Sequence, residues 1–243
     1  MLFLKPTMKK FLQKTGRFVF KFLLWFLAIT ILLTLLYRFV NPPFTPLMGI
    51  RWVETKFDKD ESNNRVFYEW RDLKNISPYM PLAVMSSEDQ HFLTHHGFDF
   101  EAIKTAIEFN KTHHQKIGAS TISQQVAKNV FLFPSRNFIR KGLEAYFTCL
   151  IEILWSKKRI MEVYLNVIEL NKNRFGVQQG GLYAFNTISK NLSMVQCARL
   201  AAILPGPRIF SARNPSGYIL MRQNQIVYQM QVIGIDVRKE FDY

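Results

Sequence analysis

Apolar residues fall into two patterns along this chain. From Phe18 to Val40 they follow one another almost without a break, interrupted only by two threonines and two basic residues. About 20 such residues span a bilayer, and this run is longer than the apolar region of a cleaved signal peptide and lacks its terminal small residues. We therefore predict an uncleaved transmembrane anchor over residues 18–40, a basic cytoplasmic tail over 1–17 and one domain over 41–243.

Beyond the anchor, apolar residues recur mainly at helical spacing. Leu82, Met85 and Phe92 illustrate the repeat, and no alternating apolar and polar run is long enough to build a sheet. A proline-rich segment over residues 41–46 is typical of an extended linker. The sequence predicts a mostly α-helical domain.

Basic residues are concentrated at the start of the chain. Residues 1–40 carry seven positive charges and no negative charge, which is half of the formal net charge of +14. The positive-inside rule places the tail in the cytoplasm and exports the domain. The other half of the charge favours an anionic partner for the domain. Because no nucleic-acid-binding motif is present, a lipid-linked phosphate at the outer membrane face fits better than nucleic acid.

The first polar motif extends from Glu88 to Gly97. Glu88, Phe92 and His95 stand at i, i+4 and i+7, which predicts one stripe of a helix. A solvated acidic face is the simpler explanation of Glu88 and Asp89, but apolar residues surround the pair. Desolvation raises the pKa of such a carboxyl group, as a general base requires.

The histidines and cysteines suggest other chemistry. His91 and His95 have the i, i+4 spacing of a zinc-binding pair. The His-Glu-x-x-His pattern and nearby cysteine ligands are absent from the sequence, so we favour His95 as a hydrogen-bonded structural residue. Cys149 and Cys197 both occupy apolar helical contexts, and the sequence leaves a disulfide and two free thiols equally open.

The second motif predicts the start of a helix. Ser120 or Thr121 can cap a helix that begins near Ile122, and Thr121 with Gln124 has capping-box spacing. Free N–H groups and hydroxyls at such a helix start suit sugar or phosphate oxygens. A well-capped helix without a ligand is the alternative, but the double glutamine followed by Lys128 favours a functional site.

Cations and a second carboxylate follow this helix. Arginine offers bidentate contacts to phosphate, and lysine offers a mobile point charge. Phenylalanines at positions 131, 133 and 138 interleave with the cations, a mixture that suits lipid headgroups and acyl chains. The second carboxylate is Glu144, for which an intrahelical ion pair is the structural alternative. The cations are Lys128, Arg136, Arg140 and Lys141.

Four motifs in this order resemble the peptidoglycan glycosyltransferases of glycosyltransferase family 51, and most closely the monofunctional biosynthetic transglycosylases of Gram-negative bacteria. E-D-x-x-F-x-x-H-x-G is met over 88–97, and G-x-S-T-I-T-Q-Q…K-N over 118–129 with Ser123 in place of threonine. R-K-x-x-E is met over 140–144, and K-x-x-I-L-E-x-Y-L-N over 157–166 with one substitution.

The resemblance implies a lysozyme-like, two-lobed α fold with a head and a jaw. It also implies polymerisation of lipid II into β-1,4 glycan strands, with inversion at the anomeric carbon and release of undecaprenyl diphosphate. Glu88 would be the general base on the acceptor 4-hydroxyl. The four cations would hold the diphosphate, and Glu144 would orient them or bind a divalent ion. The cleft would be lined by Ser120, Thr121, Gln124 and Gln125.

The same resemblance implies that no cofactor is required, although Mg²⁺ or Mn²⁺ beside the diphosphate could assist. Glu162 and Asn166 would have structural roles. The implied partners are lipid II, the growing glycan chain, the bilayer, cell-wall synthases and division proteins. The implied location is the bacterial inner membrane with the domain in the periplasm.

Two departures from the family pattern concern the backbone. Asn171 stands where the family usually has glycine, and we expect it to keep a left-handed turn. The pair Gly180-Gly181 is expected to loosen the helix that contains it. Two other functions stay open at this stage, a lysozyme-like lytic enzyme with a glutamic general acid and a catalytically silent membrane-anchored scaffold.

Overall fold

The computed structural model describes residues 6–57, 65–113, 117–135, 137–234 and 236–243, with side chains from Gln13 onward. Arg136, one of the predicted phosphate-binding cations, lies outside these ranges. Contacts divide the chain into two units, residues 1–40 and 41–243.

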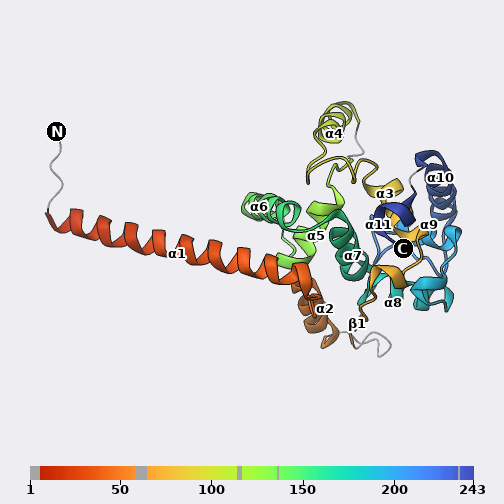
Figure 1. The fold of residues 1–243 in the computed structure, drawn as a ribbon, viewed down its shortest axis with the longest axis horizontal. Coiled ribbons are helices and arrows are strands. Elements are labelled where there is room, and N and C mark those ends of the chain that lie inside the picture. The colour runs from red at the N-terminus through yellow and green to blue at the C-terminus, as the bar shows by residue number, and fades with distance from the viewer. Residues whose placement is uncertain (1–5, 58–64, 114–116, 136, 235) are drawn as a thin grey trace. The chain divides into compact units, whose positions relative to one another are not determined.

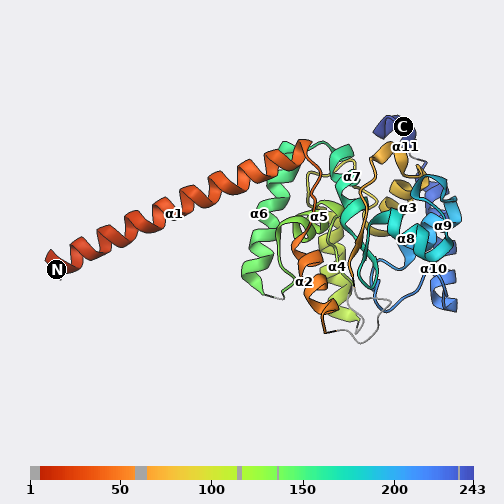
Figure 2. The same ribbon diagram turned by 90° about the horizontal axis from the view of Figure 1, so that it is seen from below.

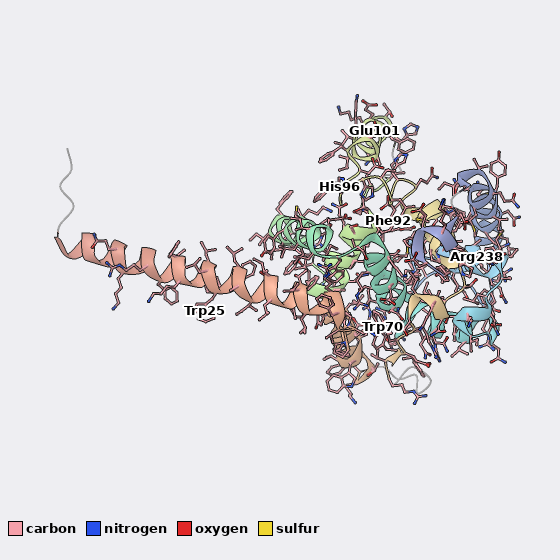
Figure 3. All side chains as sticks on the ribbon, in the orientation of Figure 1. Trp25, Trp70, Phe92, His96, Glu101 and Arg238 are labelled. Atoms are coloured by element: carbon pink, nitrogen blue, oxygen red, sulfur yellow. The ribbon has the colours of Figure 1, made fainter. Side chains whose placement is uncertain are left out.

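The first unit is dominated by helix α1 (Pro6–Phe39). Its stretch Gln13–Phe39 has 27 residues and contains an 18-residue window with a mean hydropathy of 2.4, so it is long and apolar enough to cross a bilayer. Most of its large apolar side chains are exposed, including Trp25, which is labelled in Figure 3. A helix that is apolar on all sides and exposed fits a single-pass membrane anchor.

The second unit is mostly α-helical, as predicted, and its helices form two groups on either side of α7 (Lys157–Val167). Figures 1 and 2 show α2, α5 and α6 on one side and α3, α8, α9, α10 and α11 on the other. Helix α4 follows the turn after α3. The bounds are α2 (Pro46–Thr55), α3 (Tyr79–Glu88), α4 (Phe100–Thr112), α5 (Ile122–Phe131), α6 (Phe138–Leu154), α8 (Gly176–Phe185), α9 (Met194–Ala202), α10 (Gly217–Ile233) and α11 (Val237–Phe241), with 3₁₀ turns η2 (Leu73–Asn75) and η3 (Ser189–Asn191).

Helix α7 is the centre of the domain because it is buried on nearly all sides. Seven of its residues, including Tyr164, are fully buried or nearly so. Two polar residues of α7 bind the segment that leads into α3. The Glu162 carboxylate accepts the N–H of Leu73 at 2.9 Å. The Asn166 amide accepts the N–H of Arg71 and donates to its carbonyl oxygen, both at 2.8 Å. The structural roles expected for Glu162 and Asn166 are therefore confirmed.

The domain contains a small sheet that the sequence did not predict. Its order is β1-β3-β2, formed by β1 (Phe67–Tyr68), β2 (Glu169–Asn171) and β3 (Arg174–Phe175). Strand β3 pairs in parallel with β1 and antiparallel with β2. Strands of two or three residues are too short to show an alternating apolar and polar pattern, which explains why they were not predicted.

The left-handed turn expected at Asn171 is found two residues later. Asn171 ends β2, whereas Asn173 has a φ of 61° and is 1% exposed. Its N–H is bonded to the Glu169 carboxylate at 3.3 Å, and its carbonyl oxygen accepts from Phe67 at 2.8 Å. Asparagine tolerates this conformation better than most residues with a side chain. The predicted position was wrong because Asn171 still belongs to β2, and the turn follows the strand.

Gly180 and Gly181 lie buried in α8, where the absence of a side chain permits close packing. A Cβ at Gly180 would lie 2.7 Å from Leu170 Cδ1, and one at Gly181 would lie 2.7 Å from the Thr187 carbonyl oxygen. The pair therefore allows β2 and the chain after α8 to approach the helix. The expectation that it loosens the helix was wrong.

Cys149 and Cys197 are both free thiols. Cys149 is exposed on α6, whereas Cys197 is fully buried in α9. Burial raises the pKa of the Cys197 thiol to about 12, so this group stays protonated.

Candidate active site

Glu88 is the last residue of α3, and its carboxylate is half-buried. Burial raises the pKa of this carboxyl group above its usual value. The hydrogen bond from Gln125 and the positive charges of Arg222 and Lys128 act in the opposite direction. A carboxylate with a raised pKa is a stronger base, so it can take a proton from a hydroxyl. The neighbouring cations balance its negative charge before the proton is taken.

Helix α3 ends at Glu88 because the next residue is bound elsewhere. Asp89 has an extended φ of −161°, and its carboxylate accepts the N–H of Ile122 and contacts His95 Nε2, both at 2.9 Å. The predicted helical stripe through Phe92 and His95 was therefore wrong, since these residues lie in the turn after the helix. The predicted structural role of His95 is confirmed, and Phe92 (Figure 3) is fully buried.

Glu88 borders a pocket of about 250 Å³, called here the base pocket. His91 lies on its wall, and its Nδ1 contacts the carboxylate of Asp99 at 2.8 Å. This hydrogen bond raises the pKa of His91. His91 and His95 thus face different carboxylates and do not converge as a zinc pair. The base pocket is lined by residues 86–91, Asp99, Ala102 and residues 118–121.

The start of α5 has the predicted cap. Thr121 is the N-cap, and its side chain and that of Gln124 form a capping box around a helix that begins at Ile122. Both side chains are buried, and the Thr121 hydroxyl also donates to the Gly97 carbonyl oxygen at 2.7 Å. Because Ile122 donates to Asp89 and Gln124 to Thr121, these N–H groups are not free for a ligand, contrary to expectation.

The four predicted cleft residues therefore occupy different positions. Ser120 is exposed and Thr121 is buried, and both line the base pocket. Gln124 lies within the cap. Gln125 reaches the carboxylate, with its Nε2 donating to Glu88 Oε2 at 3.0 Å. The Tyr164 hydroxyl donates to the other end of the Gln125 amide at 3.2 Å.

Ser123, which replaces the usual threonine of the second motif, is fully buried and has a definite partner. Its hydroxyl donates to the Glu152 carboxylate, which also pairs with Lys157 at 2.8 Å. The Lys157 ammonium lies 4.7 Å from the centre of the Phe92 ring. The substitution thus keeps the hydrogen bond that joins α5 to α6.

A second pocket, the cation pocket, has a volume of about 380 Å³. It contains the predicted cations Lys128 and Arg140 together with Arg51, which the sequence analysis missed. Arg51 comes from α2 and is held by Glu54 at 2.8 Å and Glu169 at 3.1 Å. These two ion pairs fix the Arg51 guanidinium and balance its charge, so the positive charge of the pocket comes from Lys128 and Arg140. The pocket is lined by Leu47, Arg51, Lys128, Asn129, Leu132, Pro134, Ser135 and Arg140.

Glu144 orients two of the predicted cations. Its carboxylate is 3% exposed and lies 2.5 Å from both Arg140 Nη1 and Lys141 Nζ, one cation on each oxygen. Among the described residues, no three acidic, histidine or cysteine side chains are placed to hold a metal ion. Because each oxygen of Glu144 is bound to a cation, the geometry fits the orienting role.

Lys128 connects the two carboxylates electrostatically. Burial holds the pKa of its ammonium below the usual value, and Arg140 and Lys141 act in the same direction. The charges of Glu144 and Glu88 oppose this shift. Lys128 lines the cation pocket and is influenced by the charges of both carboxylates.

The predicted aromatic surface near the cations is present only in part. Phe133 and Phe138 are exposed, at 67% and 96%. Phe131 instead stacks on Phe147 with ring centres 4.5 Å apart. An apolar groove of about 670 Å³ adjoins Phe133 and is otherwise lined by residues 44–57.

The sequence analysis also missed Arg222, which acts on Glu88 from α10. Its guanidinium Nε is buried without a hydrogen-bond partner among the described residues. Arg51 and Arg222 stand outside the four motifs and more than 30 positions from either carboxylate. Only the fold brings them to the site, so no local pattern could have found them.

The chain is similar to known proteins over most of its length. Residues 55–231 match the family model described as Transglycosylase. A biosynthetic peptidoglycan transglycosylase of Bacteroides thetaiotaomicron is 47% identical over 222 residues, which cover 91% of this chain and 89% of that protein. Proteins of the same description from Mannheimia succiniciproducens and Pseudomonas syringae pv. syringae are 43% and 46% identical over 236 and 225 residues. These matches cover 97% and 93% of this chain and 95% and 94% of the relatives.

Proposed function

Because the chain belongs to the transglycosylase family, we propose that it is a peptidoglycan glycosyltransferase that polymerises lipid II into β-1,4 glycan strands. The reaction releases undecaprenyl diphosphate. The observation that carries the proposal is the position of Lys128, whose charge acts on Glu88 in the base pocket and on Glu144 beside the cation pocket.

Glu88 is the general base of this reaction. Its carboxylate takes the proton of the acceptor 4-hydroxyl, and that oxygen attacks the anomeric carbon of the growing chain. The new carbon–oxygen bond forms on the face opposite the diphosphate, so the configuration inverts. The bond from the anomeric carbon to the phosphate oxygen breaks, and its electron pair leaves with the diphosphate.

The cations stabilise the leaving group. A diphosphate is a weak enough base to depart without a proton, so it needs positive charge more than a general acid. Lys128 and Arg140 line the cation pocket, and Lys141 is held beside it by Glu144. We assign Arg136 to the same group from its place in the sequence. In this proposal Glu144 acts through the cations, and no divalent ion is required.

The substrate reaches this site from a membrane. We propose that α1 anchors the chain in the bacterial inner membrane with the basic tail in the cytoplasm and the domain in the periplasm. Exposed Phe133 and Phe138 near the cations suit the lipid chain of lipid II. Cell-wall synthases and division proteins are the expected partners.

The test is glycan-strand synthesis from purified lipid II by the full chain in detergent. Glu88→Gln keeps the size of the side chain but cannot accept the proton, so polymer formation is expected to fall at least about a hundredfold. Glu240→Gln, on the exposed surface of α11, removes the same charge and is the matched control.

The other outcomes are equally informative. Polymer from Glu88→Gln at the parent rate would place the base elsewhere. A folded parent that makes no polymer would support the scaffold, and one that degrades mature wall would support the lytic enzyme.

A further inference from the structure

A third pocket of about 520 Å³, the arginine–aromatic pocket, lies on α8 and the chain before α10. Arg174 contributes from β3 and Arg213 from the segment before α10. Neither is part of the four motifs, and the pocket has no lining residue in common with the base pocket or the cation pocket. The lining residues are Arg174, Leu182, Tyr183, Ala184, Phe185, Asn186 and Arg213.

Arginine and aromatic side chains alternate beside this pocket. The Arg174 guanidinium lies 3.9 Å from the centre of the Phe67 ring and 4.6 Å from that of Tyr183. Arg65 lies over the same Phe67 ring at 4.5 Å, and Arg213 over Tyr183 at 5.7 Å. Each ring thus contacts two guanidinium groups, and the five residues form a ladder.

No carboxylate neutralises this ladder among the described residues. Among the described residues, the arginines that form ion pairs are those at positions 51, 71, 140, 159 and 208. None of these belongs to the ladder. The Nε of Arg174 is buried and has no hydrogen-bond partner in the part of the chain that the structure describes. Burial and the nearby charge of Arg65 lower the pKa of Arg174. Like charges held this close repel one another, and an anion would relieve that repulsion.

The chemistry of the walls defines the kind of anion. Guanidinium groups bind carboxylates in a bidentate geometry, while Tyr183, Phe185 and Leu182 offer faces for an attached side chain. A lone inorganic ion would leave most of 520 Å³ and these apolar faces unused. A peptide with acidic residues would bind both the guanidinium groups and the apolar faces. The excess positive charge of the domain favours its approach.

We propose that the arginine–aromatic pocket binds an acidic peptide segment of a partner protein through Arg174 and Arg213. The carboxylates lie against the guanidinium groups, and the peptide side chains pack on Tyr183 and Phe185. The site is separate from glycosyl transfer and does not rest on the function proposed above.

The test measures binding of a blocked tri-glutamate peptide to the full chain in detergent by titration calorimetry. Arg213→Gln is expected to weaken binding about tenfold, the loss of one charged hydrogen bond. Arg213→Lys should recover only part of the affinity, because lysine lacks the bidentate fork. Arg238→Gln on α11 (Figure 3) removes the same charge outside the pocket and should bind like the parent. Polymer formation from lipid II should be unchanged in both glutamine variants.

Several results would overturn the proposal. Failure of the parent to bind the peptide is one such result. Equal weakening of binding by Arg213→Gln and Arg238→Gln is another, because it would mean that only net charge matters. If inorganic phosphate displaces the peptide when both are at the same concentration, the pocket is a site for simple anions and not for a peptide. Asp58, Asp60 and Glu61 precede Arg65 in the sequence and lie outside the described residues. If neutralising these three strengthens binding, the chain's own segment is the occupant.

Discussion

Gln125 Nε2 donates a hydrogen bond to Glu88 Oε2 over 3.0 Å. The opposite end of the same amide accepts from the Tyr164 hydroxyl at 3.2 Å. Tyr164 is fully buried, and burial raises the pKa of its hydroxyl well above the usual value, so it remains a donor. The tyrosine therefore fixes the orientation in which Gln125 offers its N–H to the base.

This relationship predicts the effect of Gln125→Met. The Gln125 hydrogen bond lowers the pKa of Glu88, so its loss raises that pKa further. Because the ionised base is required, activity is lost as pH falls through this pKa. The acidic limb of the kcat/KM profile for polymerisation should move to higher pH, with kcat/KM about tenfold lower near neutrality.

Tyr164→Phe supplies the graded control for that experiment. It leaves the Gln125 amide in place but removes the group that orients it, so the acidic limb should move in the same direction by less. An unchanged profile in both variants would show that Gln125 does not act on the base.

Glu88→Gln should raise the stability of the folded chain at neutral pH. Burial raises the pKa of Glu88 above the unfolded value, taken as 4.5, so the native state holds its proton to higher pH than the unfolded state. The free energy of unfolding of the parent therefore falls as pH rises from 4.5 through the raised pKa. Glutamine does not ionise and escapes this loss.

Thermal unfolding in detergent at a series of pH values measures this difference. The two proteins should unfold at similar temperatures near pH 4, and the variant should be the more stable near pH 7.5. A constant offset at all pH values would indicate a packing effect instead of ionisation.

Glu144→Gln should lower kcat/KM by about tenfold or more, since Arg140 and Lys141 each lose a charged partner. The Glu144 charge also raises the pKa of Lys128. Without it that pKa falls, and a catalytic ammonium is lost at lower pH. The alkaline limb of the pH profile should therefore move to lower pH.

A chelator separates this explanation from a metal-dependent one. If Glu144 acts through the cations, polymerisation by the parent should continue in excess EDTA. Loss of parent activity in EDTA, restored by Mg²⁺ or Mn²⁺, would return the metal role to Glu144.

Gly181→Ala should lower the free energy of unfolding by about 1–3 kcal/mol, because the new methyl group meets the backbone oxygen of Thr187. Gly180→Ala should be milder, since the flexible end of Leu170 can move aside. Gly142→Ala in α6 meets nothing within 4 Å and should stabilise by about 0.5–1 kcal/mol. Chemical denaturation of the three variants in detergent measures this order.

Local features of the fold were predictable from the sequence. The membrane helix depends on its apolar run alone, and the cap at Thr121 depends on a partner three residues away. The end of α3 was not predictable in the same way, because Asp89 is bound to Ile122 from a distant part of the chain. The helical repeat continues past Glu88, but these tertiary hydrogen bonds favour the turn.

The candidate site shows the same division. Glu88, Lys128 and Glu144 stand in motifs whose residue types indicate their chemistry. Arg51 and Arg222 have ordinary surroundings in the sequence, and their positions depend on how α2 and α10 pack.

The hydrogen bond from the Ile122 N–H to Asp89 has an asymmetric requirement. One partner is a specific carboxylate, whereas the other is a main-chain donor that every residue except proline supplies. A substitution of Ile122 by any residue except proline therefore needs no compensating substitution at position 89. A hybrid chain joined within α4 will keep this contact as long as the half that contains position 89 supplies an aspartate there.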